Sequence, residues 1–140
     1  MQERVLTLEE AKSVAAAAEA FADSHGFSVV IAIVDGGGHL LYLQREHDTQ
    51  FGSVEVAMGK AYSAVAFKRP TVAWEERFKE GRFGYLQMPG LTGLQGGVPL
   101  KIGEEIVGGI GVSGVASQDD ERVAKAGADM LQTLTEGGTR

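Results

Sequence analysis

The feature that most constrains the fold is a set of glycines inside the apolar run Ile106–Val115, which reads IVGGIGVSGV. Glycine supplies 20 of the 140 residues, about twice its usual share of ~7%. Glycines within an apolar strand mark a tight turn, a bulge, or a close approach of another part of the structure to the backbone. Because side chains alternate between the two faces of a strand, Gly109 and Gly111 leave one face almost bare. A packed helix, a second subunit or a flat ligand would each cover such a face.

The segment Gly109–Gly114 also matches the G-x-G-x-x-G pattern of dinucleotide-binding proteins. That chemistry requires a strand before the glycines, a helix opened by them, and an acidic residue about 20 positions later, after a second strand. Here the glycines lie inside a strand, and the position about 20 residues onward falls in the final predicted helix. The pattern therefore does not indicate a nucleotide site.

Hydrophobic periodicity and turn residues predict an α+β chain with paired strands. The predicted elements are a helix over 8–24, a hairpin with strands over 28–34 and 39–44, a helix over 50–67, a short helix after Thr71, strands over 98–102 and 106–115, and a helix from Ser117. The first strand is apolar at nearly every position, which predicts cover on both of its faces. We therefore expect a single domain over 1–140, an antiparallel sheet with helices on both faces.

Several boundaries have local signals. Thr7 with Glu10, and Ser117 with Asp120, have the spacing of a capping box, and Thr71 is predicted to cap the short helix. Pro99 predicts that its strand lies at an edge of the sheet. The glycine-rich stretch 81–97 predicts a long loop, and loops of that length in compact domains are usually functional.

Composition limits the classes of partner. The net charge of -6 argues against nucleic-acid binding, and the apolar runs are far shorter than the ~20 residues of a membrane span. The absence of cysteine excludes disulfides and cysteine-bound metals, and the first residues do not resemble a signal peptide. A cytoplasmic protein with a small-molecule partner is expected.

The three histidines do not predict a metal site. His25 lies at a helix end, where a cation complements the helix dipole; His39 opens a strand and is expected at the surface; His47 lies in a polar loop. Neither a His-x-x-x-His nor a Glu-x-x-His pair is present for a metal ion. We therefore predict no bound metal ion.

Three features are candidates for holding an anion. Lys60 is a cation among small apolar residues, and either anchors an anionic ligand or lays its stem on apolar surface with its ammonium in water. Arg45 ends the second strand and has the geometry to bind a carboxylate through two hydrogen bonds. Gly96 and Gly97 would expose backbone N–H groups, which form anion-binding nests in other proteins. Together these donors suit a carboxylate or a phosphate.

The chain resembles the GlcG/HbpS-like haem-degrading domain family, which also includes the C-terminal domain of the PduO type. The resemblance runs in the family's order through the following segments: 8–11 (LEEA), 30–40 (VIAIVDGGGHL), 59–64 (GKAYSA), 96–100 (GGVPL) and 107–114 (VGGIGVSG). Each segment is short, but together they cover nearly the whole chain.

The resemblance implies a profilin-like fold, a homo-oligomer, and an association with haem, with cobalamin, or with glycolate or diol utilisation. Family members commonly have Arg-x-Asp-Gly-Ala after the second strand, where this chain has Arg45 to Thr49, so that His47 or Asp48 takes the acidic position. Haem requires an axial ligand such as His, Met or Tyr, and the first predicted helix has no histidine in its interior.

The leading hypothesis is a small cytoplasmic accessory protein that works as a homo-oligomer and binds an anionic or flat ligand: haem, a corrinoid or an organic acid. The residues expected to bind it are Arg45, His47, Lys60, Gly96 and Gly97. One alternative is an enzyme acting on a small carboxylate or a diol-pathway metabolite, with Lys60 or His47 as the acid or base. Another is a non-catalytic structural subunit.

Overall fold

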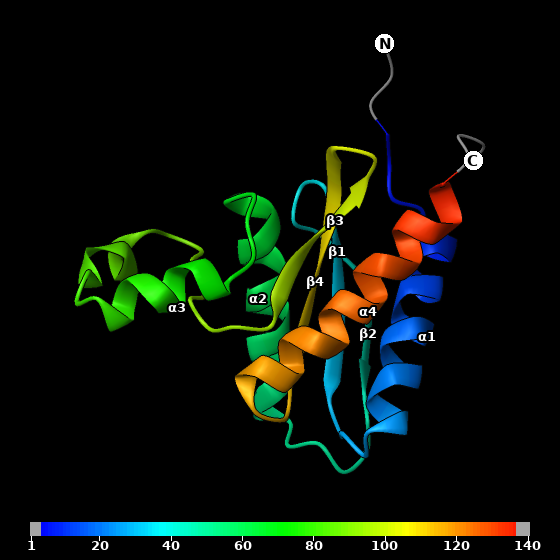
Figure 1. Cartoon of the computed structure of the whole chain (residues 1–140), viewed down its shortest axis with the longest axis horizontal. Coiled ribbons are helices and arrows are strands. Elements are labelled where there is room, and N and C mark those ends of the chain that lie inside the picture. The colour runs from blue at the N-terminus through cyan, green and yellow to red at the C-terminus, as the bar shows by residue number, and fades with distance from the viewer. Residues whose placement is uncertain (1–3, 137–140) are drawn as a thin grey trace.

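Four antiparallel strands form one open sheet in the order β2-β1-β4-β3, flanked by helices (Figure 1). The computed structural model describes residues 4–136. Its elements are α1 (Leu8–Ser24), β1 (Val30–Asp35), β2 (Leu40–Arg45), α2 (Gly52–Ala66), α3 (Val72–Lys79), a 3₁₀ helix (Phe83–Gln87), β3 (Gly97–Ile102), β4 (Glu105–Ser113) and α4 (Ser117–Thr135). The predicted α+β class and antiparallel sheet are confirmed.

The first helix begins and ends as its sequence predicts. The Glu10 N–H donates to the Thr7 hydroxyl (3.1 Å) and the Thr7 N–H donates to the Glu10 carboxylate (2.9 Å), which completes the capping box. Beyond the helix, Gly26 has φ +70°, the left-handed conformation in which glycine carries no Cβ penalty. Local signals therefore determine both ends of α1.

Two other predicted caps are wrong. The Thr71 side chain does not cap α3; its hydroxyl donates to the Leu94 carbonyl (2.5 Å) and accepts the Gly97 N–H (2.9 Å). Ser117 does not cap α4 either, because Ala116 is the N-cap residue and has no side-chain hydrogen bond there. At Thr71, contacts with Leu94 and Gly97, which are more than 20 residues away in the sequence, replace the local cap.

The sheet has a layer of helix on each face. Ile31 and Ile33 of β1 belong to the core that α1 and α4 cover, and Val30, Ala32 and Val34 belong to the core that α2 covers. The two layers are visible in Figure 1, where α4 and α1 run side by side on the face opposite α2. The prediction that both faces of the first strand are covered is confirmed.

The bare face of β4 is filled by α2 of the same chain. A Cβ atom built on Gly109 would lie 2.5 Å from the carbonyl oxygen of Ala61, and one on Gly111 would overlap the carbonyl oxygen of Ala57. Of the three covers considered for these glycines, the packed helix is therefore the one present. This face is not an interface with a second subunit, and a flat ligand cannot lie on it.

The segment between α2 and β3 projects away from the sheet. Figure 1 shows α3 and the loop after it, in green, extending to one side of the three-layered body of helices and sheet. Thr71 fastens the base of this arm, because its N–H also donates to the Gly97 carbonyl (3.0 Å). Pro99 lies on β3, which is an edge strand as predicted. Within residues 4–136, no helix is both long and apolar enough to cross a membrane.

Candidate functional site

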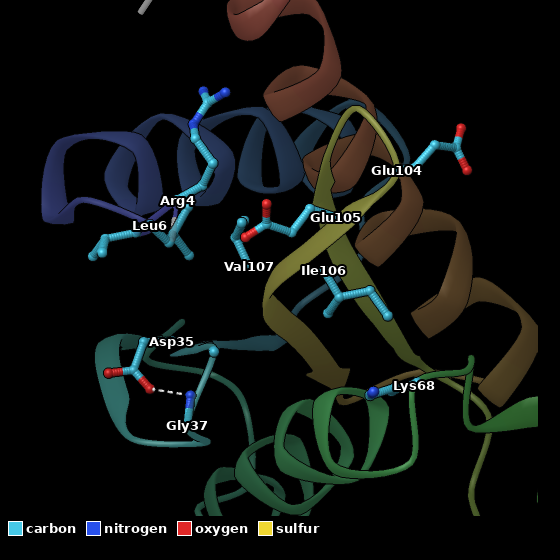
Figure 2. A pocket seen from close by; sticks show the side chains of 11 residues that line it. Arg4, Leu6, Asp35, Gly37, Lys68, Glu104, Glu105, Ile106 and Val107 are labelled. Carbon is cyan, nitrogen blue, oxygen red and sulfur yellow. Dashed lines mark hydrogen bonds between the residues drawn. The ribbon is translucent and has the colours of Figure 1, made fainter. Parts of the chain in front are cut away.

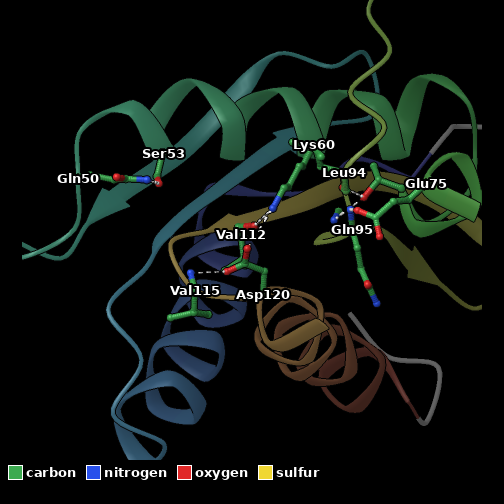
Figure 3. Close-up of polar contacts among 11 residues, drawn as sticks. Gln50, Ser53, Lys60, Glu75, Leu94, Gln95, Val112, Val115 and Asp120 are labelled. Atoms are coloured by element: carbon green, nitrogen blue, oxygen red, sulfur yellow. Dashed lines mark hydrogen bonds and ion pairs between the residues drawn. The ribbon is translucent and has the colours of Figure 1, made fainter. Parts of the chain in front are cut away.

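Lys60 lies inside the protein and is paired. Its side chain is 3% exposed, and its ammonium donates to the Val112 carbonyl (2.8 Å) and to Asp120 Oδ2 (3.2 Å) (Figure 3). The other Asp120 oxygen accepts the Val115 N–H (3.1 Å). The pair therefore connects α2 with α4 across the end of β4. Lys60 does not lay its stem on the surface with its ammonium in water, which corrects that interpretation.

Burial dominates the electrostatics of this pair. It lowers the pKa of Lys60 below its ordinary value and raises the pKa of Asp120, although the attraction between the two charges opposes both shifts. An ion pair taken out of water loses hydration that the mutual attraction only partly replaces. The ammonium is thus held by groups of the protein itself, and Lys60 does not line either cavity described below.

Gly96 and Gly97 lie beside Lys60, as the predicted site requires, but their close contacts are internal. Gly96 has φ +132°, and a Cβ atom there would lie 2.7 Å from the Lys60 ammonium. The Gly97 N–H already donates to Thr71, so it is not free to form an anion nest. Glycine at these two positions makes room for the ion pair and for the base of the arm.

Arg45 and His47 shape the loop between β2 and α2. Arg45 donates to the carbonyl oxygens of Thr49 (2.8 Å) and His47 (3.5 Å). The His47 side chain is 84% exposed, with ring nitrogens 3.5 and 3.1 Å from the carboxylates of the residues on either side. No hydrogen bond or ion pair within residues 4–136 joins Arg45 or His47 to Lys60, and a ligand contact at either residue stays a prediction.

The larger cavity lies at the end of the sheet where β4 begins and β1 ends. The cavity was not predicted from the sequence. It has a volume of about 680 Å³ and is lined by residues 4–6, 35–37, 68 and 104–107 (Figure 2). Those segments are the start of the chain's described part, the β1–β2 turn, the residue after α2's C-cap, and the β3–β4 turn. The turns could have been placed at one end of the sheet from strand direction alone, but the cavity between them could not.

The charged groups in this cavity are of both signs. Partial burial tends to raise the pKa of Asp35, but hydrogen bonds from the N–H groups of His39 (3.0 Å) and Gly37 (2.9 Å) outweigh it and hold the pKa below its ordinary value. Lys68 and Glu105 form no side-chain hydrogen bond or ion pair with any residue in the range 4–136. Asp35 is therefore ionised at neutral pH, and two further charges are available to a ligand.

A second, smaller hollow of about 270 Å³ lies on the arm, where Arg77 and Arg82 approach Glu76 and Glu80. No histidine lines either cavity. Within residues 4–136, no group of three or more His, Cys, Asp or Glu side chains is placed to hold a metal ion.

Comparisons with known proteins identify the family. A family model described as "haem degrading protein HbpS-like" matches residues 6–129. Protein GlcG of Escherichia coli K12 is 38% identical over 109 residues, which cover 78% of this chain and 81% of GlcG.

Solved structures have the same fold. The crystal structure of Klebsiella pneumoniae ORFY superposes with a TM-score of 0.89 at 30% identity, covering 96% of this chain and 95% of that one. The complex of PduOC with haem superposes with a TM-score of 0.82 at 27% identity, covering 91% and 95%. With its strand order, its helices on both faces and a family match over almost its whole length, the chain belongs to the HbpS-like family.

Proposed function

We propose that this HbpS-like chain is a small cytoplasmic accessory protein that binds a small organic acid in the 680 Å³ cavity and works as a homo-oligomer. The observation that carries the ligand proposal is the Lys68 ammonium, which lines that cavity and has no partner within residues 4–136. The volume is within the ~300–1,000 Å³ range of small-molecule sites. A lysine in such a position contributes a charge-assisted hydrogen bond to a carboxylate.

Haem does not fit either cavity as an iron-ligated cofactor. Haem iron needs an axial donor, for which His is the usual residue, and the linings of both cavities lack His, Met and Tyr. The histidines lie elsewhere. His39 and His47 have side chains 82% and 84% exposed. Both His25 ring nitrogens have neighbours: Nδ1 lies 2.9 Å from the Phe21 carbonyl and Nε2 lies 3.2 Å from Arg122. Among the ligands considered, these observations favour the organic acid.

The ligand proposal is tested by calorimetric titration with acetate, glycolate and haemin, using wild type, Lys68→Met and a control variant, Lys12→Met. Lys12 is an exposed lysine of α1 outside the cavity. We expect a carboxylate to bind wild type and Lys12→Met equally, and Lys68→Met about tenfold more weakly. Equal binding to all three proteins, binding of haemin alone, or no binding would each overturn the proposal.

The oligomer proposal is supported by the exposed surface of the arm. Three large apolar side chains are uncovered there: Phe83 (60% exposed), Leu86 (65%) and Leu94 (48%). Segment 67–88 contains five of the chain's 13 Lys and Arg residues but only three of its 19 Asp and Glu residues, so the rest of the chain carries a net charge of -8. A basic, apolar arm and an acidic body are complementary surfaces for a second copy.

Light scattering tests this assembly. We expect wild type to have at least the mass of a dimer at micromolar concentration, and the double variant Phe83→Ser/Leu86→Ser to have a smaller mass. Phe51→Ser is the matched control, because Phe51 is 83% exposed but lies at the start of α2. A monomeric wild type, or a double variant with unchanged mass, would refute assembly through the arm.

A further inference from the structure

The cavity at the turn end of the sheet has opposite charges on opposite walls. Figure 2 shows Lys68 on the helical wall, Asp35 on the β1–β2 turn, and the Glu105 carboxylate turned inward from the start of β4. The figure also shows the Arg4 guanidinium and the Glu104 carboxylate turned away from the space between these walls. The inner surface therefore presents one cation and two anions.

Lys68, Asp35 and Glu105 all have bonding capacity left. The hydrogen-bond and ion-pair partners of Asp35 all contact its Oδ1 atom: the N–H groups of Gly37 and His39 and the ring of His39. Its second oxygen has no partner within residues 4–136, and the same is true of the Glu105 carboxylate and the Lys68 ammonium. Because the three groups do not pair with one another at 4 Å or less, each remains available to a charged group of a ligand.

The backbone at Lys68 is a second, independent indication. Lys68 has φ +57° and is the one non-glycine residue with positive φ in the range 4–136. It follows the C-cap of α2, a position where the left-handed conformation is usually taken by glycine because a Cβ is unfavourable there. Strained residues of this kind occur at functional sites more often than elsewhere. A glycine would end the helix with less strain, but it would not place an ammonium in the cavity.

The floor of the cavity between these charges is apolar. Leu6 and Val107 belong to the core and are each only 2% exposed, whereas Val5 is 65% exposed and Ile106 is half-buried, so the last two offer apolar surface to a ligand. A ligand that fits this surface has an apolar portion as well as two charged groups of opposite sign. A simple carboxylate would satisfy Lys68 but would lie near the unpaired carboxylates of Asp35 and Glu105, which repel it.

We propose that the cavity binds a small zwitterion of amino-acid or dipeptide size, with its carboxylate at Lys68, its ammonium at Asp35 and Glu105, and its apolar portion against Val5 and Ile106. The proposal rests on the proposed function, because it names the ligand class of the same cavity. The zwitterion proposal differs from the organic-acid proposal because it requires the ligand to have an ammonium group. The two are therefore separated by ligands that have one charged group or both.

The test is calorimetric titration of the full chain with L-leucine, N-acetyl-L-leucine, L-leucinamide and L-alanyl-L-leucine. N-acetylation removes the positive charge and amidation removes the negative one. We expect leucine or alanyl-leucine to bind at least about tenfold more tightly than either leucine derivative, as a charge-assisted hydrogen bond implies. Binding of N-acetyl-leucine as tight as that of leucine would overturn the zwitterion proposal and leave the organic-acid proposal standing. Absence of binding by all four probes would overturn this proposal, and the titrations with acetate and glycolate decide the other one separately.

Two variants assign the charges. Glu105→Gln should weaken binding of the zwitterion about tenfold but should not weaken binding of N-acetyl-leucine, and Lys68→Met should weaken binding of the zwitterion but not that of leucinamide. Glu55→Gln, an exposed carboxylate of α2 outside the cavity, is the control and should bind like wild type. Each of these substitutions is at an exposed side chain, so the variants are expected to fold. Zwitterion binding unaffected by Glu105→Gln and Lys68→Met would overturn the assignment.

Discussion

The buried Lys60–Asp120 pair makes a quantitative prediction about stability. Both side chains are 3% exposed, and removing one partner of a buried pair leaves an uncompensated charge, typically at a cost of ~3–5 kcal/mol. Lys60→Met also takes the donor from the Val112 carbonyl. We expect it to lower the free energy of unfolding by about 3 kcal/mol at neutral pH, the low end of the range, because burial already favours protonation of Asp120.

The double variant Lys60→Met/Asp120→Asn separates the attraction between the two charges from the cost of burying them. Asp120→Asn alone leaves the Lys60 ammonium with the Val112 carbonyl as its remaining partner, and should also cost about 3 kcal/mol. The asparagine oxygen can still accept the Val115 N–H. The double variant Lys60→Met/Asp120→Asn therefore buries no charge, and it leaves the Val115 N–H with a hydrogen-bond acceptor. Because neutral replacements of a buried pair are often tolerated, we expect the double variant to lie within about 2 kcal/mol of wild type.

Urea unfolding followed by circular dichroism and by the fluorescence of the single tryptophan, Trp74, measures these differences. All proteins are compared at one protomer concentration, because association adds to apparent stability. Lys125→Met is the matched control. It removes an ion pair with Glu121 in which the lysine is 60% exposed, and should change stability by less than ~1 kcal/mol. If the single variants each cost less than 1 kcal/mol and their effects add in the double variant, the pair does not hold α2 and α4 together.

Three further predictions concern Gly111, the cap at Thr7, and the pH dependence of the Lys60–Asp120 pair. Gly111→Val should abolish folding or lower stability by more than the ~1–3 kcal/mol usual for overpacking, because the new side chain meets α2 backbone; thermal melting unchanged from wild type would show that the helix can move. Thr7→Ala should cost ~1 kcal/mol by removing the α1 cap, and a melting curve identical to wild type would contradict this. The depressed pKa of Lys60 means that the folded state binds its proton less tightly than the unfolded state, whose pKa is about 10.5. The free energy of unfolding of wild type, relative to that of Lys60→Met/Asp120→Asn, should therefore rise as the pH increases toward 10.5. A fall in this difference would contradict the inferred effect of burial on the pKa of Lys60.

Much of the fold could be predicted because its determinants are local. The capping box at Thr7 and Glu10, the left-handed Gly26, and the apolar first strand each depend on neighbouring residues or on a simple periodicity. The capping pattern at Ser117 and Asp120 failed for a physical reason. Asp120 hydrogen-bonds Val115 and Lys60 instead, and a buried ammonium competes strongly for a carboxylate.

The candidate site was predicted less well, because the partners of its residues are distant in the sequence. Lys60 was identified as unusual from its apolar neighbours, but its partner lies 60 residues away. Gly96 and Gly97 were expected to have free N–H groups, but the Gly97 N–H donates to the hydroxyl of Thr71, which lies 26 residues away in the sequence. The cavity was missed because its lining comes from four segments that are separated in the sequence.

The sequence by itself determined most of the secondary structure, the antiparallel pairing, the edge position of Pro99 and the close approach that Gly109 and Gly111 require, because these follow from backbone sterics and hydrophobic periodicity. Tertiary structure alone decided what approaches those glycines, which carboxylate neutralises Lys60, and where unpaired charges meet around a hollow. Such contacts depend on how helices and turns pack in three dimensions, and sequence spacing contains no information about distances between segments that only folding brings together.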